Sequence, residues 1–66
     1  MYRNILAEMA RCAYTRADLA KNLNMSIATL RKKIKGETPF KMEEISKLLS
    51  IFGRSVTFEY LFQDSN

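Results

Sequence analysis

TRADLAKNLNMSIATLRKKIKG, residues 15–36, is the stretch of this chain that decides the predicted fold. Thr15 and Ser26 both belong to the residue types that cap a helix, because a side-chain oxygen can accept a hydrogen bond from a free backbone N–H. Asp18 follows Thr15 by three residues, which is the spacing of a capping box. The two start signals predict two short helices, over residues 16–23 and 27–35.

Two residues in this stretch are suited to end these helices. Asn24 is of the non-glycine type that most readily adopts the left-handed conformation, and Gly36 adopts it without steric cost. Two short helices joined by a tight turn make a helix-turn-helix, which we place at residues 16–35. Because the helices cross closely, Ala20 supplies the small residue where they meet. Four apolar side chains should fill the surrounding space: Leu19, Leu23, Met25 and Leu30.

Apolar spacing predicts a further helix on each side of this motif. The first covers residues 2–13 and has its apolar face at Ile5, Leu6 and Met9. The other has its apolar face at Ile45, Leu48, Leu49 and Phe52. It should end at Gly53 and begin at Lys41 or, because lysine is a poor N-cap, at Thr38.

The tail alternates apolar side chains with others from Val56 to Phe62, a period of two that predicts a β-strand. A short fifth helix with Phe58, Leu61 and Phe62 inward is the alternative. A lone strand leaves backbone donors and acceptors unpaired, so we expect it to pair with the same strand of a second copy across a two-fold axis. The predicted dimerisation residues of this segment, 55–63, are Val56, Phe58, Tyr60 and Phe62.

Length and composition limit the chain to one small globular domain, residues 1–66, and the capping signals and apolar spacing predict the mainly α class, with four helices and a C-terminal strand. The 66 residues are 47% apolar and 27% charged, and no apolar stretch reaches the roughly 20 residues that a membrane span needs. Histidine is absent and Cys12 is the single cysteine, so the commonest general base and metal ligand are missing. We therefore expect no enzyme, no metal and no cofactor. The lone thiol and the lack of a secretory signal predict a cytoplasmic protein with no membrane partner.

Positive charge is concentrated around the second helix of the motif. Residues 1–35 hold eight Lys or Arg against two acids, residues 36–66 hold three against five, and four of the five residues in 31–35 are basic. With about 100° between successive residues, Leu30 and Ile34 face the core. The outward side consists of Ala28, Arg31, Lys32 and Lys35, with Ser26 and Ile27 at its boundary. Such a surface suits a major groove, because small residues permit close approach and long cations reach guanine edges or phosphates.

Other roles for these basic residues stay open at this point. A solvated helix face is the alternative explanation of a short basic run, and Lys33, away from the outward side, is expected only to be solvated. Ile27 either touches a thymine methyl group or closes the core. Three cations stand near helix ends, where the phosphates of a bound duplex would pass: Arg16, Lys35 and Lys41.

The longer stretch TRADLAKNLNMSIATLRKKIKGETPFKMEEISKLLSIFG, residues 15–53, resembles the Cro/repressor-type helix-turn-helix family of phage and bacterial transcription regulators. The resemblance implies a sequence-specific transcription regulator, a repressor of the Cro kind, that binds double-stranded DNA at a palindromic operator as a homodimer. It also implies that Arg16 contacts phosphate and that the base-reading residues are Ser26, Ile27, Ala28, Arg31 and Lys32. The chain departs from the family pattern at Asn24, where glycine is usual, and at Ile34, one place after the more common inward position.

The ending LLSIFGRSVTFEYLF, residues 48–62, resembles a subgroup of small regulators and antitoxins in which a glycine leads from a helix into a strand. This second resemblance implies an alternative function, an antitoxin-like or adaptor module whose main partner is another protein. The helix-turn-helix alone does not decide between the two, because one fold serves many functions.

Overall fold

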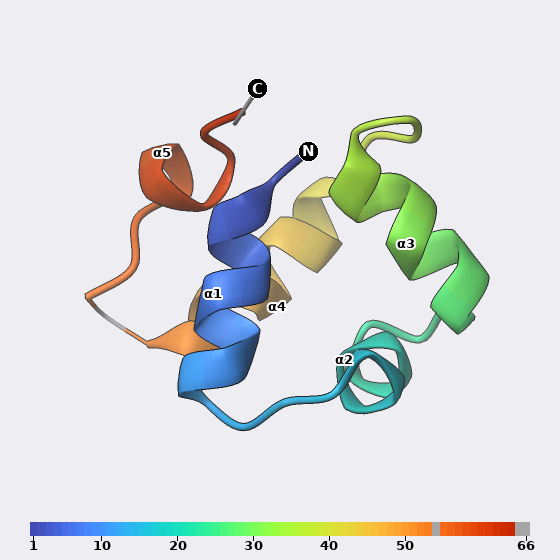
Figure 1. Cartoon of the computed structure of the whole chain (residues 1–66), viewed down its shortest axis with the longest axis horizontal. Helices are drawn as coiled ribbons and strands as arrows, with labels where there is room; N and C mark the ends of the chain where they lie inside the picture. The colour runs from blue at the N-terminus through green and yellow to red at the C-terminus, as the bar shows by residue number, and fades with distance from the viewer. Residues whose placement is uncertain (54, 65–66) are drawn as a thin grey trace.

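Five α-helices form the described part of the chain, residues 1–53 and 55–64 of a computed structural model, and no strand occurs in those ranges (Figure 1). In chain order they are α1 (Arg3–Arg11), α2 (Arg16–Asn22), α3 (Ile27–Lys35), α4 (Met42–Phe52) and α5 (Phe58–Leu61). Figure 1 shows α1 between α5 on one side and the α2–α3 pair on the other, with α4 behind them. The mainly α fold class is confirmed.

The helix-turn-helix begins and ends its helices close to the predicted residues. Thr15 and Asp18 make the complete capping box, with Asp18 N donating to Thr15 Oγ1 over 3.0 Å and Thr15 N donating to Asp18 Oδ2 over 3.1 Å. Ser26 Oγ accepts from the N–H of Thr29 at 3.1 Å, which caps α3. Asn24 has φ 59° and Gly36 has φ 87°, so both take the left-handed conformation expected of them. These bonds span three residues or fewer, which is why the sequence alone could predict them.

The core receives one fully buried side chain from every helix: Ile5, Leu19, Leu30, Leu48 and Leu61. Ala20 and Ile34 are each 2% exposed, so Ala20 is buried, as a small residue between α2 and α3 has to be, and the inward side of α3 is confirmed. Burial of one such aliphatic side chain contributes about 1.5 to 3 kcal/mol. The helices are too short to be stable alone, so this shared core is what holds α3 in place.

The predicted strand at 55–63 is wrong, and the alternative short helix is present instead. Thr57 Oγ1 accepts from Tyr60 N at 3.1 Å and caps α5, and Leu61 is fully buried. Phe62 is half-buried as the helix alternative required, but Phe58 is 48% exposed rather than inward. In a single chain a lone strand would leave its backbone groups unpaired, whereas one helical turn closes hydrogen bonds locally and still buries Leu61.

A polar network fastens α5 to α1. Tyr60 Oη donates to Glu8 Oε2 at 3.0 Å, and Asn4 Nδ2 donates to the carbonyl oxygen of Tyr60 at 2.7 Å. Arg11 Nε donates to the other carboxylate oxygen of Glu8 at 2.5 Å, and this bond lowers the pKa of Glu8 below its ordinary value. The bond to Glu8 raises the pKa of Tyr60. The buried Glu8 carboxylate is therefore compensated from two sides.

Candidate nucleic-acid interface

The outward side of α3 carries the polar and basic residues that the sequence placed there. All four residues of this side, which are Ala28, Arg31, Lys32 and Lys35, are exposed, and Ser26 is exposed at the N-cap. Ile27 is 45% exposed, so its side chain does not close the core. Together with Glu37, the four residues line a shallow cavity of about 220 Å³, here called the outer cleft. The small side chain of Ala28 leaves room above the first turn of α3.

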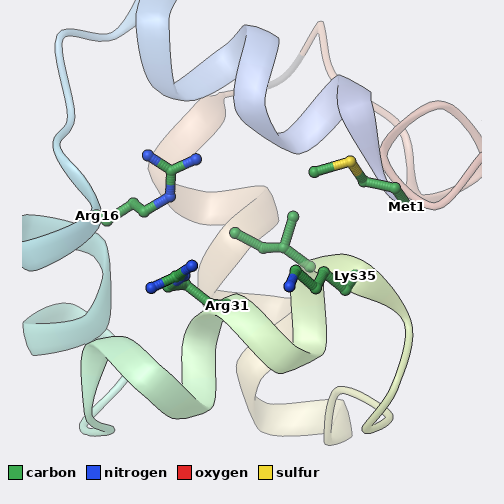
Figure 2. A pocket seen from close by; sticks show the side chains of 5 residues that line it. Met1, Arg16, Arg31 and Lys35 are labelled. Carbon is green, nitrogen blue, oxygen red and sulfur yellow. The ribbon is translucent and has the colours of Figure 1, made fainter.

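A second cavity, the inner cleft, lies between α3 and the start of α2. Its volume is about 200 Å³, and its lining residues are Met1, Arg16, Arg31, Ile34 and Lys35. Figure 2 shows the guanidinium groups of Arg16 and Arg31 near one end of this cleft, with Lys35 and Met1 near the other. The turn at Asn24 orients α2 so that its first residue, Arg16, reaches the basic side of α3. The structure thus brings together three cations that are 15 to 19 residues apart or one turn apart in sequence.

No Lys or Arg side chain of the two clefts forms an ion pair with a residue that the structure describes, although Glu37 lines the outer cleft. The ion pairs found there join the Met1 amino group to Asp64, Arg11 to Glu8 and Lys33 to Glu44. The charges on Arg16, Arg31, Lys32 and Lys35 are therefore free to meet an external anion. A concentrated, unpaired set of cations on one face attracts polyanions from a distance.

The expectation that Lys33 is only solvated is wrong. The residue is 5% exposed, and its Nζ donates to Glu44 Oε1 at 2.6 Å, while the backbone N of Lys41 donates to the same oxygen at 2.8 Å. Burial raises the pKa of Glu44, but the hydrogen bonds from Lys33 and Lys41 outweigh it, and the pKa lies below its ordinary value. Lys33 thus ties α3 to the start of α4 and adds no free charge to the basic run.

Sequence reasoning could have found only half of this arrangement. Glu44 stands three residues after Lys41, which is the spacing at which a glutamate reaches back to the N-cap N–H. Its pairing with Lys33, eleven residues earlier, has no local signal, because it depends on how α3 and α4 cross. The angle around α3 separated inward from outward residues but could not show that α4 covers the side on which Lys33 lies.

Lys41 is exposed and lies apart from the other predicted phosphate ligands. It begins α4 and lines a separate depression of about 210 Å³, whose other lining residues are Leu23, Asn24, Glu43, Glu44 and Lys47. The structure therefore groups Arg16 and Lys35 with Arg31 but does not group Lys41 with them. Two carboxylates in the same depression also offset part of the positive charge around Lys41.

The predicted dimerisation residues are divided by the fold rather than aligned on one face. Val56 is 8% exposed and belongs to the core. Phe62 is half-buried and packs edge-on against the rings of Tyr2 and Phe40, at centroid distances of 5.3 and 5.4 Å. Phe58 and Tyr60 remain exposed on α5, at 48% and 36%. A helix distributes these residues around its axis, whereas a strand would have placed all four on one side.

Comparisons with models of protein families, with curated proteins and with solved structures gave no match for this chain. Among residues 1–53 and 55–64, no helix has the length and apolar character needed to cross a membrane. Within the same ranges, no three or more metal-ligating side chains come together. The arrangement of the two clefts is therefore the basis of the functional argument.

Proposed function

We propose that this protein is a sequence-specific, double-stranded DNA-binding regulator of transcription, a repressor of the Cro kind. The observation that carries the proposal is the unpaired cationic surface formed by α3 and the first residue of α2. An α-helix fits the major groove, and phosphates on either side of the groove attract the cations that flank it. The local resemblance to the Cro/repressor-type family supports the same function.

The two clefts suggest which residues of this surface would read bases and which would bind phosphates. The outer cleft, which Ala28 and Lys32 help to line, would face the base edges, and the capping Ser26 and exposed Ile27 would enter the groove first. Arg16 and Lys35 would contact the sugar-phosphate backbone, together with Lys41 further along the duplex. Arg31 and Lys35 line both clefts, so they would lie where base and phosphate contacts meet.

A palindromic operator would require two copies of this chain. Two recognition helices reach successive major grooves when they are about 34 Å apart across a two-fold axis. Because residues 58–61 form a helix, a ribbon of paired strands cannot join the two copies, and the exposed Phe58 and Tyr60 on α5 are the proposed contacts instead. Sedimentation of the intact chain and of Phe58→Asp, with and without duplex DNA, tests this: an unchanged dimer in the variant would refute it.

Titration with DNA at different salt concentrations tests the function itself. Three phosphate contacts per subunit, about six in a dimer, predict a loss of affinity of about 10³-fold between 50 and 200 mM salt. Binding sites selected from a random duplex library would then show whether Lys32→Ala reduces discrimination, by about 1 to 3 kcal/mol for a bidentate guanine contact. Lys21→Ala is the matched control, since Lys21 is exposed on α2 and lines neither cleft. Salt-independent or absent binding would favour the protein-interaction module instead.

A further inference from the structure

The inner cleft has a composition that base reading does not require. Three of its five lining residues, Arg16, Arg31 and Lys35, have cationic side chains, and the other two, Met1 and Ile34, have apolar side chains; the amino group of Met1 is paired with Asp64. No carboxylate lines it, although the part of the chain that the structure describes contains acids in both halves. Like charges that line one cleft repel one another, and an anion bound among them would offset that repulsion.

We infer that the inner cleft is a binding site for linked phosphate groups, a diphosphate or longer oligophosphate. Each guanidinium can donate two parallel hydrogen bonds to phosphate oxygens, and the Lys35 ammonium adds a point charge one helical turn from Arg31. The volume of about 200 Å³ is roughly that of seven waters at about 30 Å³ each, so it admits a phosphate with part of its linked neighbour. Ile34 also lines the cleft but is 2% exposed, so it offers a ligand little apolar surface, and the three cations are the groups open to it.

Occupation of the inner cleft has a consequence for the outer cleft, and this step rests on the proposed function. Arg31 and Lys35 line both clefts. An oligophosphate that holds Arg31 and Lys35 in the inner cleft withdraws them from the outer one, where DNA would need them. A free oligophosphate and the phosphates of a duplex therefore compete for the same cations, and the first lowers affinity for the second.

Inorganic pyrophosphate is the probe, titrated into the full chain at constant ionic strength and followed by calorimetry and by the change in Tm. We expect saturable binding to the intact protein and a rise in Tm, because the ligand binds only the folded state. Arg16→Gln and Arg31→Gln should each weaken binding at least about tenfold, from the loss of a charge-assisted bidentate contact. Lys21→Gln removes the same single charge from an exposed position on α2 and should change the affinity for pyrophosphate less than about twofold.

The measurement separates this site from general attraction to a positive protein. Equal weakening in Arg16→Gln, Arg31→Gln and Lys21→Gln, or a titration that does not saturate, would overturn the inference. Arg16 and Arg31 are exposed, and the Tm of each unliganded variant shows whether the fold is intact. Orthophosphate serves as the comparison, and an affinity equal to that of pyrophosphate would refute the requirement for linked phosphates.

A second arm, with duplex DNA, distinguishes the source of the phosphates. Pyrophosphate that binds the intact chain and displaces duplex supports both the site and its competition with DNA. If pyrophosphate binds but duplex DNA does not, the proposed function is refuted, and a free oligophosphate remains as the ligand of the inner cleft. Duplex binding without pyrophosphate binding overturns the inference and leaves the proposed function standing.

Discussion

Lys33→Met should destabilise the fold while leaving the salt dependence of DNA binding nearly unchanged. The substitution keeps the aliphatic stem of the side chain and removes the ammonium that donates to Glu44 at 2.6 Å. Glu44 then keeps one donor, the backbone N of Lys41 at 2.8 Å. Since Lys33 is already neutralised in the intact protein, its loss removes little charge that an incoming phosphate could use.

The burial of the ion pair sets the magnitude of this effect. The two side chains are 7% and 13% exposed, which is close to the fully buried case, where removal of one partner costs about 3 to 5 kcal/mol, and far from exposed pairs at about 0 to 1 kcal/mol. The remaining hydrogen bond from Lys41 favours the lower end, about 3 kcal/mol. In a domain of this size that corresponds to a fall in Tm of roughly 12 to 24 °C.

Thermal unfolding by circular dichroism measures the loss, with Lys35→Met as the matched control on the same helix. Lys35 is exposed and is a proposed phosphate contact, so its variant should stay within about 0.5 kcal/mol of the intact chain but should flatten the DNA salt slope by about one unit. The loss in Lys33→Met should shrink as the pH falls below the ordinary Glu44 pKa of 4.5, because protonation removes the uncompensated charge. A loss under about 1 kcal/mol, or equal salt slopes for the two variants, would refute the reasoning.

Three further predictions concern the frame that holds the interface. Ala13 has φ 58°, so Ala13→Gly should relieve left-handed strain and raise stability by about 1 kcal/mol in chemical denaturation; an unchanged midpoint contradicts this. Tyr60→Phe removes the donor to Glu8, and we expect a lower Tm and an increase in amide exchange rate that is larger in α5 than in α3. Equal exchange rates in the intact and variant chains would argue against this role of Tyr60. The pKa values of Glu8, Asp18 and Glu44 lie below their ordinary values in the folded state, so these carboxylates stabilise the fold fully above about pH 4.5. This stabilisation is lost as the pH falls through their folded-state pKa values. Constant stability between pH 5 and 2 would contradict that assignment.

The helix-turn-helix shows what nearby residues can specify. Thr15, Ser26 and Gly36 act on backbone groups within a few positions, so the bounds of α3 could be read without knowledge of the rest of the fold. The inward side of α3 follows from helical periodicity, and Leu30 and Ile34 are buried as predicted. The candidate base-reading residues are exposed for the same reason.

The tail shows where local pattern is insufficient. The alternation from Val56 to Phe62 favours a strand, but a strand requires a partner that the single chain does not provide. The Thr57 cap and the fully buried Leu61 favour a helix, and Leu61 has a place to pack only because the other four helices contribute to the same core. The formation of α5 therefore depends on the tertiary structure as well as on the local sequence.

By itself, the sequence determined the helices that begin at Thr15 and Ser26, the separation of core from surface on α3 and the concentration of positive charge near its end. Only the tertiary structure decided that Lys33 is neutralised by Glu44, that Lys41 lies apart, and that Arg16 joins the cations of α3 around the inner cleft. The physical reason is the range of the interactions. Caps and periodicity act within one or two turns, whereas contacts between helices depend on their crossing angles, which the whole core sets at once.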